Sequence, residues 1–488
     1  MLVRFSALLS LLLAVPAVAA SSSLDPTWWQ KYQFIQSGMA LGAAGPSFSV
    51  TVGANVNVSN ECGPQSETFI TMFDDQQIGA GSNEIFRLPM RGYVSDDGGN
   101  NWLGTDLPLP PPIGANGTDF GSDPSLAWDT QRTLFYSYIV VFFGNGNGIN
   151  GTELAVARST DRGRTWTPTF FSFSSGSNHF NDKPMITTDR NLSSPFKDRI
   201  YVAWDAASGG SATGGGVRVA TSQDGGGSFT VLRADEPHGP GRAIGAVPFT
   251  GPNGELYVAW NDFAANTIAF TRSLDGGSSF SAQSVISSKT IAFDIAIPAE
   301  FSRHALVYPA CDADRSAGPH RGRLVCSWMD AGPQGTEILV AISDDRGSTW
   351  STPRPVGDQL SAPVDRFNHW LAVDSVTGDV VVSFYDTRND TTGQRFGTDI
   401  YLARSFDGGN TFAADVRVST QSSNEHDCNG VFPCTAINYG NQQGDYEGVA
   451  SFGGVAHPIW MDSRDNQVPA PGCRTGLAME EVFTAAVQ

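Results

Sequence analysis

The chain has 488 residues, and its 49 acidic against 30 basic residues give a formal net charge of −19. Such a charge repels phosphate backbones, so the sequence disfavours nucleic acid as a partner. Charged residues make up only 16%, whereas there are 54 Gly and 30 Phe. Frequent glycine turns and many aromatic residues predict an all-β chain of short strands, long enough to bury a large core.

The first 20 residues have the features of a secretory signal peptide. Arg4 supplies the positive end, an apolar run follows over 5–15, and Ala17-Val18-Ala19 has the small-x-small pattern of a cleavage site. The apolar run is too short to cross a bilayer, and no later stretch has about 18 uninterrupted apolar residues. The sequence therefore predicts a secreted, extracellular protein without a membrane span.

Six cysteines fit an oxidising compartment. Cys311 and Cys326 flank one hairpin-like stretch, so we expect them to form a disulfide. The remaining cysteines allow three pairings, and these stay open for Cys62, Cys428, Cys434 and Cys473. Sequons of the form N-x-Ser/Thr predict glycosylation, if exposed and in a host that glycosylates, at Asn57, Asn116, Asn150, Asn191 and Asn389.

One short motif, S-x-D-x-G-x-x-[WF], occurs six times, with 51 to 70 residues between successive aspartates. The aspartates of the six copies are Asp97, Asp161, Asp224, Asp275, Asp345 and Asp407. In such a turn the carboxylate can accept backbone N–H bonds, glycine supplies positive φ, and the aromatic ring packs against its own sheet. We therefore interpret these aspartates as structural rather than catalytic.

Short apolar runs between the motifs predict strands. In chain order they include 154–157, 183–186, 201–204, 217–220, 256–260, 324–328, 338–341, 370–373, 381–385 and 400–403. Four antiparallel strands in each repeat of about 50 to 70 residues predict the blade of a β-propeller.

A last unit without the motif, from 444 to 487, brings the expected number of blades to seven, and a six-bladed ring with an irregular end is the alternative. We expect a stretch near 47–52 to supply a strand that closes the ring. The sequence thus predicts a signal peptide at 1–20, an N-terminal extension at 21–46 and a single propeller domain at 47–488.

Charged residues stand where the predicted innermost strands begin. All innermost strands of a propeller start at one mouth of the central funnel, and the motif turns lie on the opposite face. The acidic residues at these starts are Glu67, Asp123, Asp182 and Asp445, and the basic residues are Lys183, Arg303, His304, Arg366 and His369. We expect these groups either to bond neighbouring blades or to bind a polar ligand, since crowded carboxylates acquire the raised pKa values of general acids.

The six motifs resemble the Asp boxes, or BNR repeats, of the sialidase (neuraminidase) superfamily, and the resemblance covers most of 50–488. Sialidases of that family hold the substrate carboxylate with three arginines and use a Tyr nucleophile, a Glu and an Asp acid/base. The segment Phe86-Arg87-Leu88-Pro89 is similar to the family's Arg-Ile-Pro motif but lies too close to the first box to be equivalent to it. Seven blades also depart from the six of family sialidases, so no arginine triad is assigned here.

Together these features favour a secreted, sialidase-like glycoside hydrolase acting on a polar or acidic sugar, with strict sialidase activity the less expected form. The candidate catalytic residues are Asp182, Glu67, Asp445 and, as nucleophile, Tyr446. The candidate substrate-binding residues are Arg303, Arg366, Lys183, His304, His369 and Asp123. The alternative is a non-catalytic extracellular propeller that binds glycan or protein. We expect a carbohydrate or glycoconjugate ligand, no cofactor, no metal and a monomer.

Overall fold

A computed structural model of the chain describes most of the residues after position 50. The described ranges are 51–60, 65–84, 88–112, 119–142, 151–175, 179–208, 215–236, 242–300, 304–426, 443–464 and 480–488. Every regular element in these ranges is a β-strand. A helix long and apolar enough to cross a membrane is absent from them.

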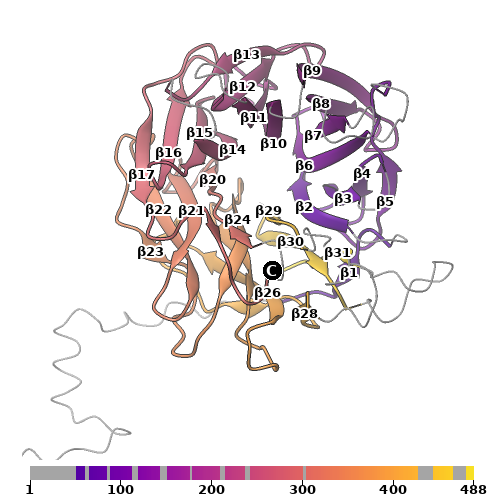
Figure 1. Cartoon of the computed structure of the whole chain (residues 1–488). Helices are drawn as coiled ribbons and strands as arrows, with labels where there is room; N and C mark the ends of the chain where they lie inside the picture. Colours follow the sequence, from indigo (N-terminus) through magenta and orange to yellow (C-terminus); the bar gives the residue numbers. More distant parts are fainter. Residues whose placement is uncertain are drawn as a thin grey trace, which may run out of the picture. The chain divides into compact units, whose positions relative to one another are not determined.

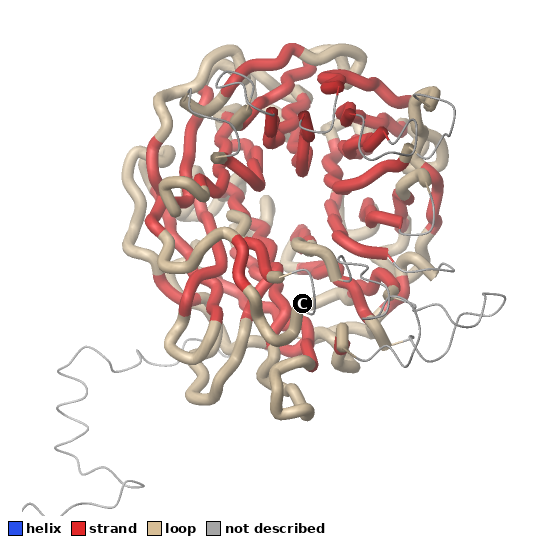
Figure 2. The backbone as a smooth tube through the Cα atoms, in the orientation of Figure 1, coloured by secondary structure: helices blue, strands red, loops and turns tan. Residues whose placement is uncertain are grey.

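The described strands form seven antiparallel sheets of four strands, arranged as blades around a common axis (Figure 1). In Figure 2 the strands, drawn in red, surround the centre of the ring. This arrangement confirms the predicted seven-bladed, all-β propeller.

The first four blades follow the chain order from the innermost to the outermost strand. Blade 1 is β2 (Gln65–Met72), β3 (Ile78–Glu84), β4 (Arg91–Ser95) and β5 (Leu103–Asp106), and blade 2 is β6 (Phe120–Trp128), β7 (Leu134–Phe142), β8 (Gly151–Ser159) and β9 (Thr167–Ser175). Blade 3 is β10 (His179–Thr188), β11 (Ile200–Ser208), β12 (Val217–Ser222) and β13 (Thr230–Arg233), and blade 4 is β14 (Ala243–Thr250), β15 (Leu256–Asp262), β16 (Thr267–Ser273) and β17 (Ser284–Ser288).

The last three blades include two additions. Blade 5 is β20 (Ala310–Ala313), β21 (Leu324–Ala331), β22 (Thr336–Ser343) and β23 (Arg354–Pro355), and a two-stranded sheet of β18 (Asp294–Ile295) and β19 (Ala305–Leu306) precedes it. Blade 6 is β24 (Arg366–Val373), β25 (Val380–Asp386), β26 (Gly397–Ser405) and β27 (Val416–Arg417), with β28 (Ser423–Asn424) also paired to β26. Blade 7 is β29 (Gly448–Phe452), β30 (Val455–Asp462), β31 (Glu481–Thr484) and β1 (Val56–Asn57).

Aromatic residues of the second strands fill the core. Four tryptophans at similar places in their blades, Trp204, Trp260, Trp328 and Trp460, are at most 1% exposed. Strands covered on both faces read as nearly continuous apolar runs, which explains the unbroken patterns seen in the sequence. Large buried rings of this kind contribute most of the apolar area that holds the blades together.

The six copies of the S-x-D-x-G-x-x-[WF] motif, which we call Asp boxes after their aspartate, form the expected turns between the third and fourth strands of blades 1 to 6. In the third box Gly226 N donates to Ser222 Oγ at 2.9 Å, and Ser228 N donates to Asp224 Oδ1 at 3.0 Å. Hydrogen bonds from the side chains of Ser228 and Ser222, followed by the backbone bond, lower the pKa of Asp224 to about 2. The same N–H to carboxylate bond occurs at Asp97, Asp161, Asp275, Asp345 and Asp407.

The N-terminal segment closes the ring by adding the outermost strand of blade 7. Strand β1 pairs antiparallel with β31, with Val56 opposite Thr484. The closing strand therefore lies slightly later than the expected stretch at 47–52, although Val52 also bridges to Val487.

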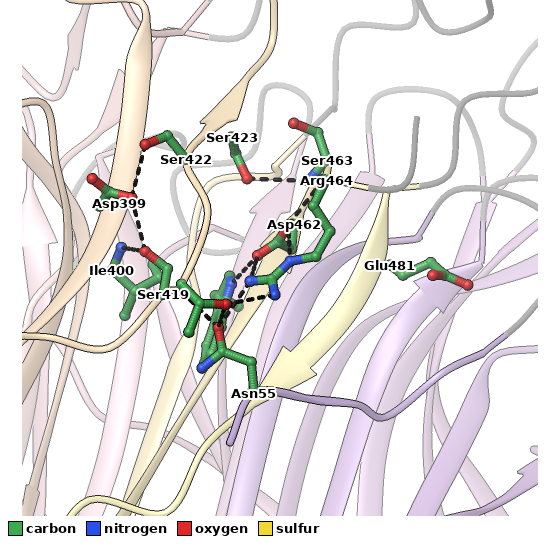
Figure 3. Close-up of polar contacts among 12 residues, drawn as sticks. Asn55, Asp399, Ile400, Ser419, Ser422, Ser423, Asp462, Ser463, Arg464 and Glu481 are labelled. Atoms are coloured by element: carbon green, nitrogen blue, oxygen red, sulfur yellow. Dashed lines mark hydrogen bonds and ion pairs between the residues drawn. The ribbon is translucent and has the colours of Figure 1, made fainter. Parts of the chain in front are cut away.

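Side chains extend this closure across two blades (Figure 3). Asn55 Nδ2 donates to Val418 O of blade 6 at 2.9 Å, while its Oδ1 accepts bonds from Thr420 N at 2.7 Å and from Arg464 Nη2 at 2.9 Å. Arg464 is in turn held by Asp462, whose Oδ2 lies 2.6 Å from Arg464 Nη2. One asparagine thus ties the N-terminal segment to blades 6 and 7 together.

The predicted disulfide is confirmed, since Cys311 and Cys326 are bonded to each other and lie opposite each other on β20 and β21. The other four cysteines lie outside the described residues. Of the sequons, Asn116 and Asn150 also lie outside them. Asn191 follows β10, whereas the amide nitrogens of Asn57 and Asn389 donate to Glu481 and Asp399.

We predict that Asn55→Ala lowers the free energy of unfolding by about 1–3 kcal/mol, because it leaves partly buried groups of two blades without partners. Chemical denaturation followed by tryptophan fluorescence measures this. Thr51→Ala is the matched control, since Thr51 lies in the same segment, is exposed, and pairs with Gln488 only through its backbone. Equal unfolding midpoints for the two variants would contradict the role of Asn55.

Candidate functional site

Five innermost strands carry a β-bulge close to their first residues. A residue in each bulge has positive φ: Glu67 (50°), Asp123 (63°), Lys183 (50°), Gly245 (70°) and Asn368 (44°). Residues other than glycine rarely adopt this conformation, which costs of order 1–3 kcal/mol unless the surroundings enforce it. The bulge therefore sets the direction of charged side chains at one end of the axis.

Hydrogen bonds from the preceding blade hold these bulges. Asp123 N donates to Asn83 Oδ1 of blade 1 at 2.8 Å, and Lys183 N donates to Asp123 Oδ2 of blade 2 at 2.9 Å. Gly245 N donates to Asp205 Oδ2 of blade 3 at 2.5 Å. In blade 1 the donor Glu67 N reaches the carbonyl of Gln443, which precedes blade 7, at 3.4 Å. Four of the five bulges are thus junctions between two blades.

Six side chains from blades 1, 3 and 7 and from the start of blade 5 meet at this end of the axis. The Lys183 ammonium lies 3.0 Å from the ring centroid of Tyr446 and 3.9 Å from that of Tyr308. Tyr308 OH donates to Asp445 Oδ2. We call this group the axial cluster, and its members are Glu67, Asp182, Lys183, Tyr308, Asp445 and Tyr446.

Burial controls the charges in the axial cluster. Desolvation, followed by the charge and hydrogen bond of Asp123 and by the charges of Asp205 and Asp445, raises the pKa of Asp182 well above its usual range. Desolvation also lowers the pKa of Lys183, although the neighbouring carboxylates, Asp445 foremost, oppose this effect. Asp182 therefore retains its proton to a higher pH than an exposed aspartate does, beside carboxylates that act on a lysine, and such a difference in environment can give two carboxyl groups different roles.

A second set of buried acids adjoins the axial cluster. Asn368 Nδ2 donates to Gly444 O at 3.0 Å and to Glu300 Oε1 at 3.5 Å, so it lies between the two groups. Burial raises the pKa of Glu425 to about 7 and the pKa values of Glu447 and Glu480 well above their usual range.

Sequence reasoning missed Glu300, Glu425 and Glu480 because they lie in connections that have no equivalent in the other repeats. It also missed Tyr308, which could have been found from its place two residues before β20.

The structure brings Glu67, Asp123, Asp182, Lys183, Asp445 and Tyr446 together, as their mutual charge effects on Asp182, Lys183 and Tyr446 show. Asp123 has a structural role, since its two carboxylate oxygens accept hydrogen bonds from Lys183 N and Ser122 Oγ.

Three other sequence-predicted residues do not join the axial cluster. The Arg366 guanidinium points between blades and bonds Asp386 and the carbonyls of Val356 and Asp358. His369 is buried beside the backbone of Ser327 in blade 5, and burial lowers the pKa of its imidazole to about 4. His304 is exposed and lies 2.8 Å from Asp294, while Arg303 lies outside the described residues.

A cavity of about 460 Å³ also lies among the innermost strands, but it is lined by residues other than those of the axial cluster. The charged residues therefore converge on one another, as expected. They are largely buried, however, and do not line this cavity.

No family model and no curated protein matches the chain. Among solved structures it is similar to the NanB sialidase of Streptococcus pneumoniae (12% identity, 78% of this chain and 72% of that chain, TM-score 0.46). It is also similar to a leech intramolecular trans-sialidase (14%, 77% and 72%, 0.47) and to an α-L-arabinofuranosidase of Fusarium graminearum (11%, 72% and 98%, 0.47). Solved structures that resemble the chain thus include glycosidases, but similarity at this level leaves its function open.

We predict that the protein unfolds more easily at pH 7.5 than at pH 5. Carboxyls with raised pKa, such as Glu425 and Asp205 at about 7, keep protons in the folded state that the unfolded chain releases from about pH 4 upward. Each proton so retained lowers the free energy of unfolding by about 1.4 kcal/mol per pH unit over that window. His369 and His457, with pKa values of about 4, oppose the trend but are fewer than the raised carboxyls.

Chemical denaturation of wild type and Glu425→Gln at the two pH values measures the effect. The amide does not titrate, so the variant should lose less stability between pH 5 and 7.5. Asp75→Asn removes an exposed carboxyl and should keep the wild-type profile. A profile of Glu425→Gln as steep as that of wild type would contradict the prediction.

Proposed function

We propose that the protein is a secreted glycoside hydrolase whose catalytic carboxyls lie in the axial cluster. The observation that carries this proposal is the proximity of Asp182, whose pKa is raised by burial and by Asp123, to Asp445, whose charge acts on Asp182 and on Lys183. Glycosidases require such a pair, one carboxylic acid and one carboxylate, at the same bond.

Asp182 is the general acid in this proposal and donates its proton to the oxygen of the leaving sugar or alcohol. Asp445 is the second carboxyl group in this proposal, because Tyr308 OH donates to its Oδ2 and its charge acts on the nearby Lys183. Tyr446 is a weaker candidate for the nucleophile, since burial and then the charges of Glu67, Asp123 and Asp445 raise the pKa of its phenol well above 10.

The charges of the axial cluster favour a neutral polar sugar over an acidic one. Lys183 is its cation, and it faces the carboxylates of Glu67 and Asp445. A sialic-type substrate needs several guanidiniums at its carboxylate. Arg366, the one predicted substrate-binding arginine within the described ranges, bonds Asp386 and backbone carbonyls instead.

A non-catalytic glycan- or protein-binding propeller is the second candidate. It is favoured by the deep burial of the axial cluster, in which Glu67 is 4%, Lys183 2% and Tyr446 3% exposed. In that case the charged groups serve to join the blades, and ligands contact the loops around them.

We predict that Asp182→Asn lowers kcat on natural or poorly activated glycosides by about 10²–10⁴-fold. The loss should be much smaller on a dinitrophenyl glycoside, because that leaving group departs without a proton. The measurement is a screen of neutral, uronyl and sialyl substrates with wild type, Asp182→Asn and, as control, the exposed Asp75→Asn, each checked for an unchanged unfolding midpoint.

Equal turnover by Asp182→Asn and wild type on poorly activated substrates would remove Asp182 from the mechanism. Saturable glycan binding by the wild-type protein without turnover of any sugar would favour the second candidate.

A further inference from the structure

The cavity of about 460 Å³ is an axial channel on the Asp-box side of the ring. It is lined by the later parts of all seven innermost strands, such as Phe69–Met72 of β2 and Trp370–Val373 of β24. These strands run from their bulges toward the Asp boxes, as the bond from Gly98 N of the first box to Gln76 O, just after β2, shows. The channel is therefore separate from the axial cluster, which lies at the starts of the same strands.

Two guanidiniums contribute to the lining of this channel. Arg190 Nη1 donates to Met72 O at 2.9 Å and Nη2 to Phe73 O at 2.7 Å, and its Cζ lies 4.7 Å from the centroid of the Phe73 ring. Arg190 forms no ion pair with any carboxylate of the described residues. These carbonyl bonds fix the guanidinium and leave N–H donors for another acceptor.

Arg315 has a different environment. Its guanidinium forms a two-pronged ion pair with Asp312, through Nη1 and Nη2, and Nη1 also donates to Thr250 O at 3.0 Å. Asp312 is the one carboxylate among the lining residues, so the lining carries two positive charges and one negative. This excess of positive charge is notable in a chain whose net charge is −19.

The rest of the lining combines apolar side chains with hydroxyl and amide groups, and its surface is about equally polar and apolar. It includes Phe69, Met185, Val247, Trp370 and Val449, which are contributed by five different blades. Pockets of about 300–1,000 Å³ are typical of small-molecule sites. The channel combines such a volume with a guanidinium that forms no direct ion pair within the described residues.

We propose that the axial channel binds a small organic carboxylate, with its carboxylate on Arg190 and the rest of the molecule among these side chains. The planar fork of a guanidinium forms two parallel, charge-assisted hydrogen bonds with a carboxylate, and a neutral amide cannot form this pair. Burial and the charge of Arg315 lower the pKa of Arg190 to about 10, although the charges of Asp74, Asp129 and Asp198 oppose this effect.

Isothermal titration calorimetry with 3-phenylpropionate tests this proposal, with the neutral 3-phenylpropionamide as matched ligand. We expect saturable binding of one carboxylate per chain. The amide should bind with an affinity at least about tenfold lower. Arg190→Gln should weaken binding of the carboxylate to the level of the amide. Arg132→Gln is the control, because Arg132 lies over the same Phe73 ring at 4.8 Å but pairs with Asp74 and is half exposed.

A second variant tests the proposal independently, in case Arg190→Gln fails to fold. Ala372→Phe keeps both arginines and fills the channel, so it should abolish binding of the carboxylate. Asp182→Asn should bind 3-phenylpropionate as wild type does, which separates this site from the axial cluster. Equal affinities for carboxylate and amide, undiminished binding by Ala372→Phe, or no binding by wild type at millimolar ligand would overturn the proposal.

Discussion

The hydrogen bond from a bulge N–H to the preceding blade is the constraint from which the rest of the structure follows. A bulge leaves an N–H of the innermost strand without a partner in its own sheet, and such a group must find an acceptor when buried. Asn83, Asp123 and Asp205 supply that acceptor to the next blade. The ring is thus joined near its axis by polar side chains, and these same bonds hold Asp123, Lys183 and Gly245 at positive φ.

Because of this arrangement, the chain contains aspartates in two opposite environments. Asp205, buried at a bulge junction, has its pKa raised to about 7, whereas Asp224, near the surface in an Asp box, has its pKa lowered to about 2. Both accept backbone N–H bonds, but desolvation dominates at Asp205, whereas side-chain hydrogen bonds from Ser228 and Ser222 dominate at Asp224. The box carboxylates serve as turn acceptors with lowered pKa values, while Asp205, with a pKa of about 7, can hold and release a proton near neutral pH.

The sequence was sufficient to predict the blades, because the box motif and the apolar runs are local and repeat. It also predicted the Cys311–Cys326 bond and the convergence of Glu67, Asp182, Lys183 and Asp445, since equivalent positions of a closed ring face one axis. It did not predict the direction of Arg366, which depends on Asp386 and on two carbonyls of another blade. Nor could it reveal Glu425 and Glu480, whose proximity arises from irregular connections, or the axial channel, whose Arg190 lies beyond a strand rather than at its start.

The proposed mechanism depends most on the raised pKa of Asp182 in the folded protein. Infrared difference spectroscopy of wild type minus Asp182→Asn, recorded from pH 4 to 8, observes the carbonyl stretch of this one carboxyl. We expect a protonated-carboxyl band that persists to higher pH than the band of an exposed aspartate and that disappears at lower pH when Asp123 is replaced by Asn. A band that disappears near pH 4, as for an exposed aspartate, would contradict this expectation.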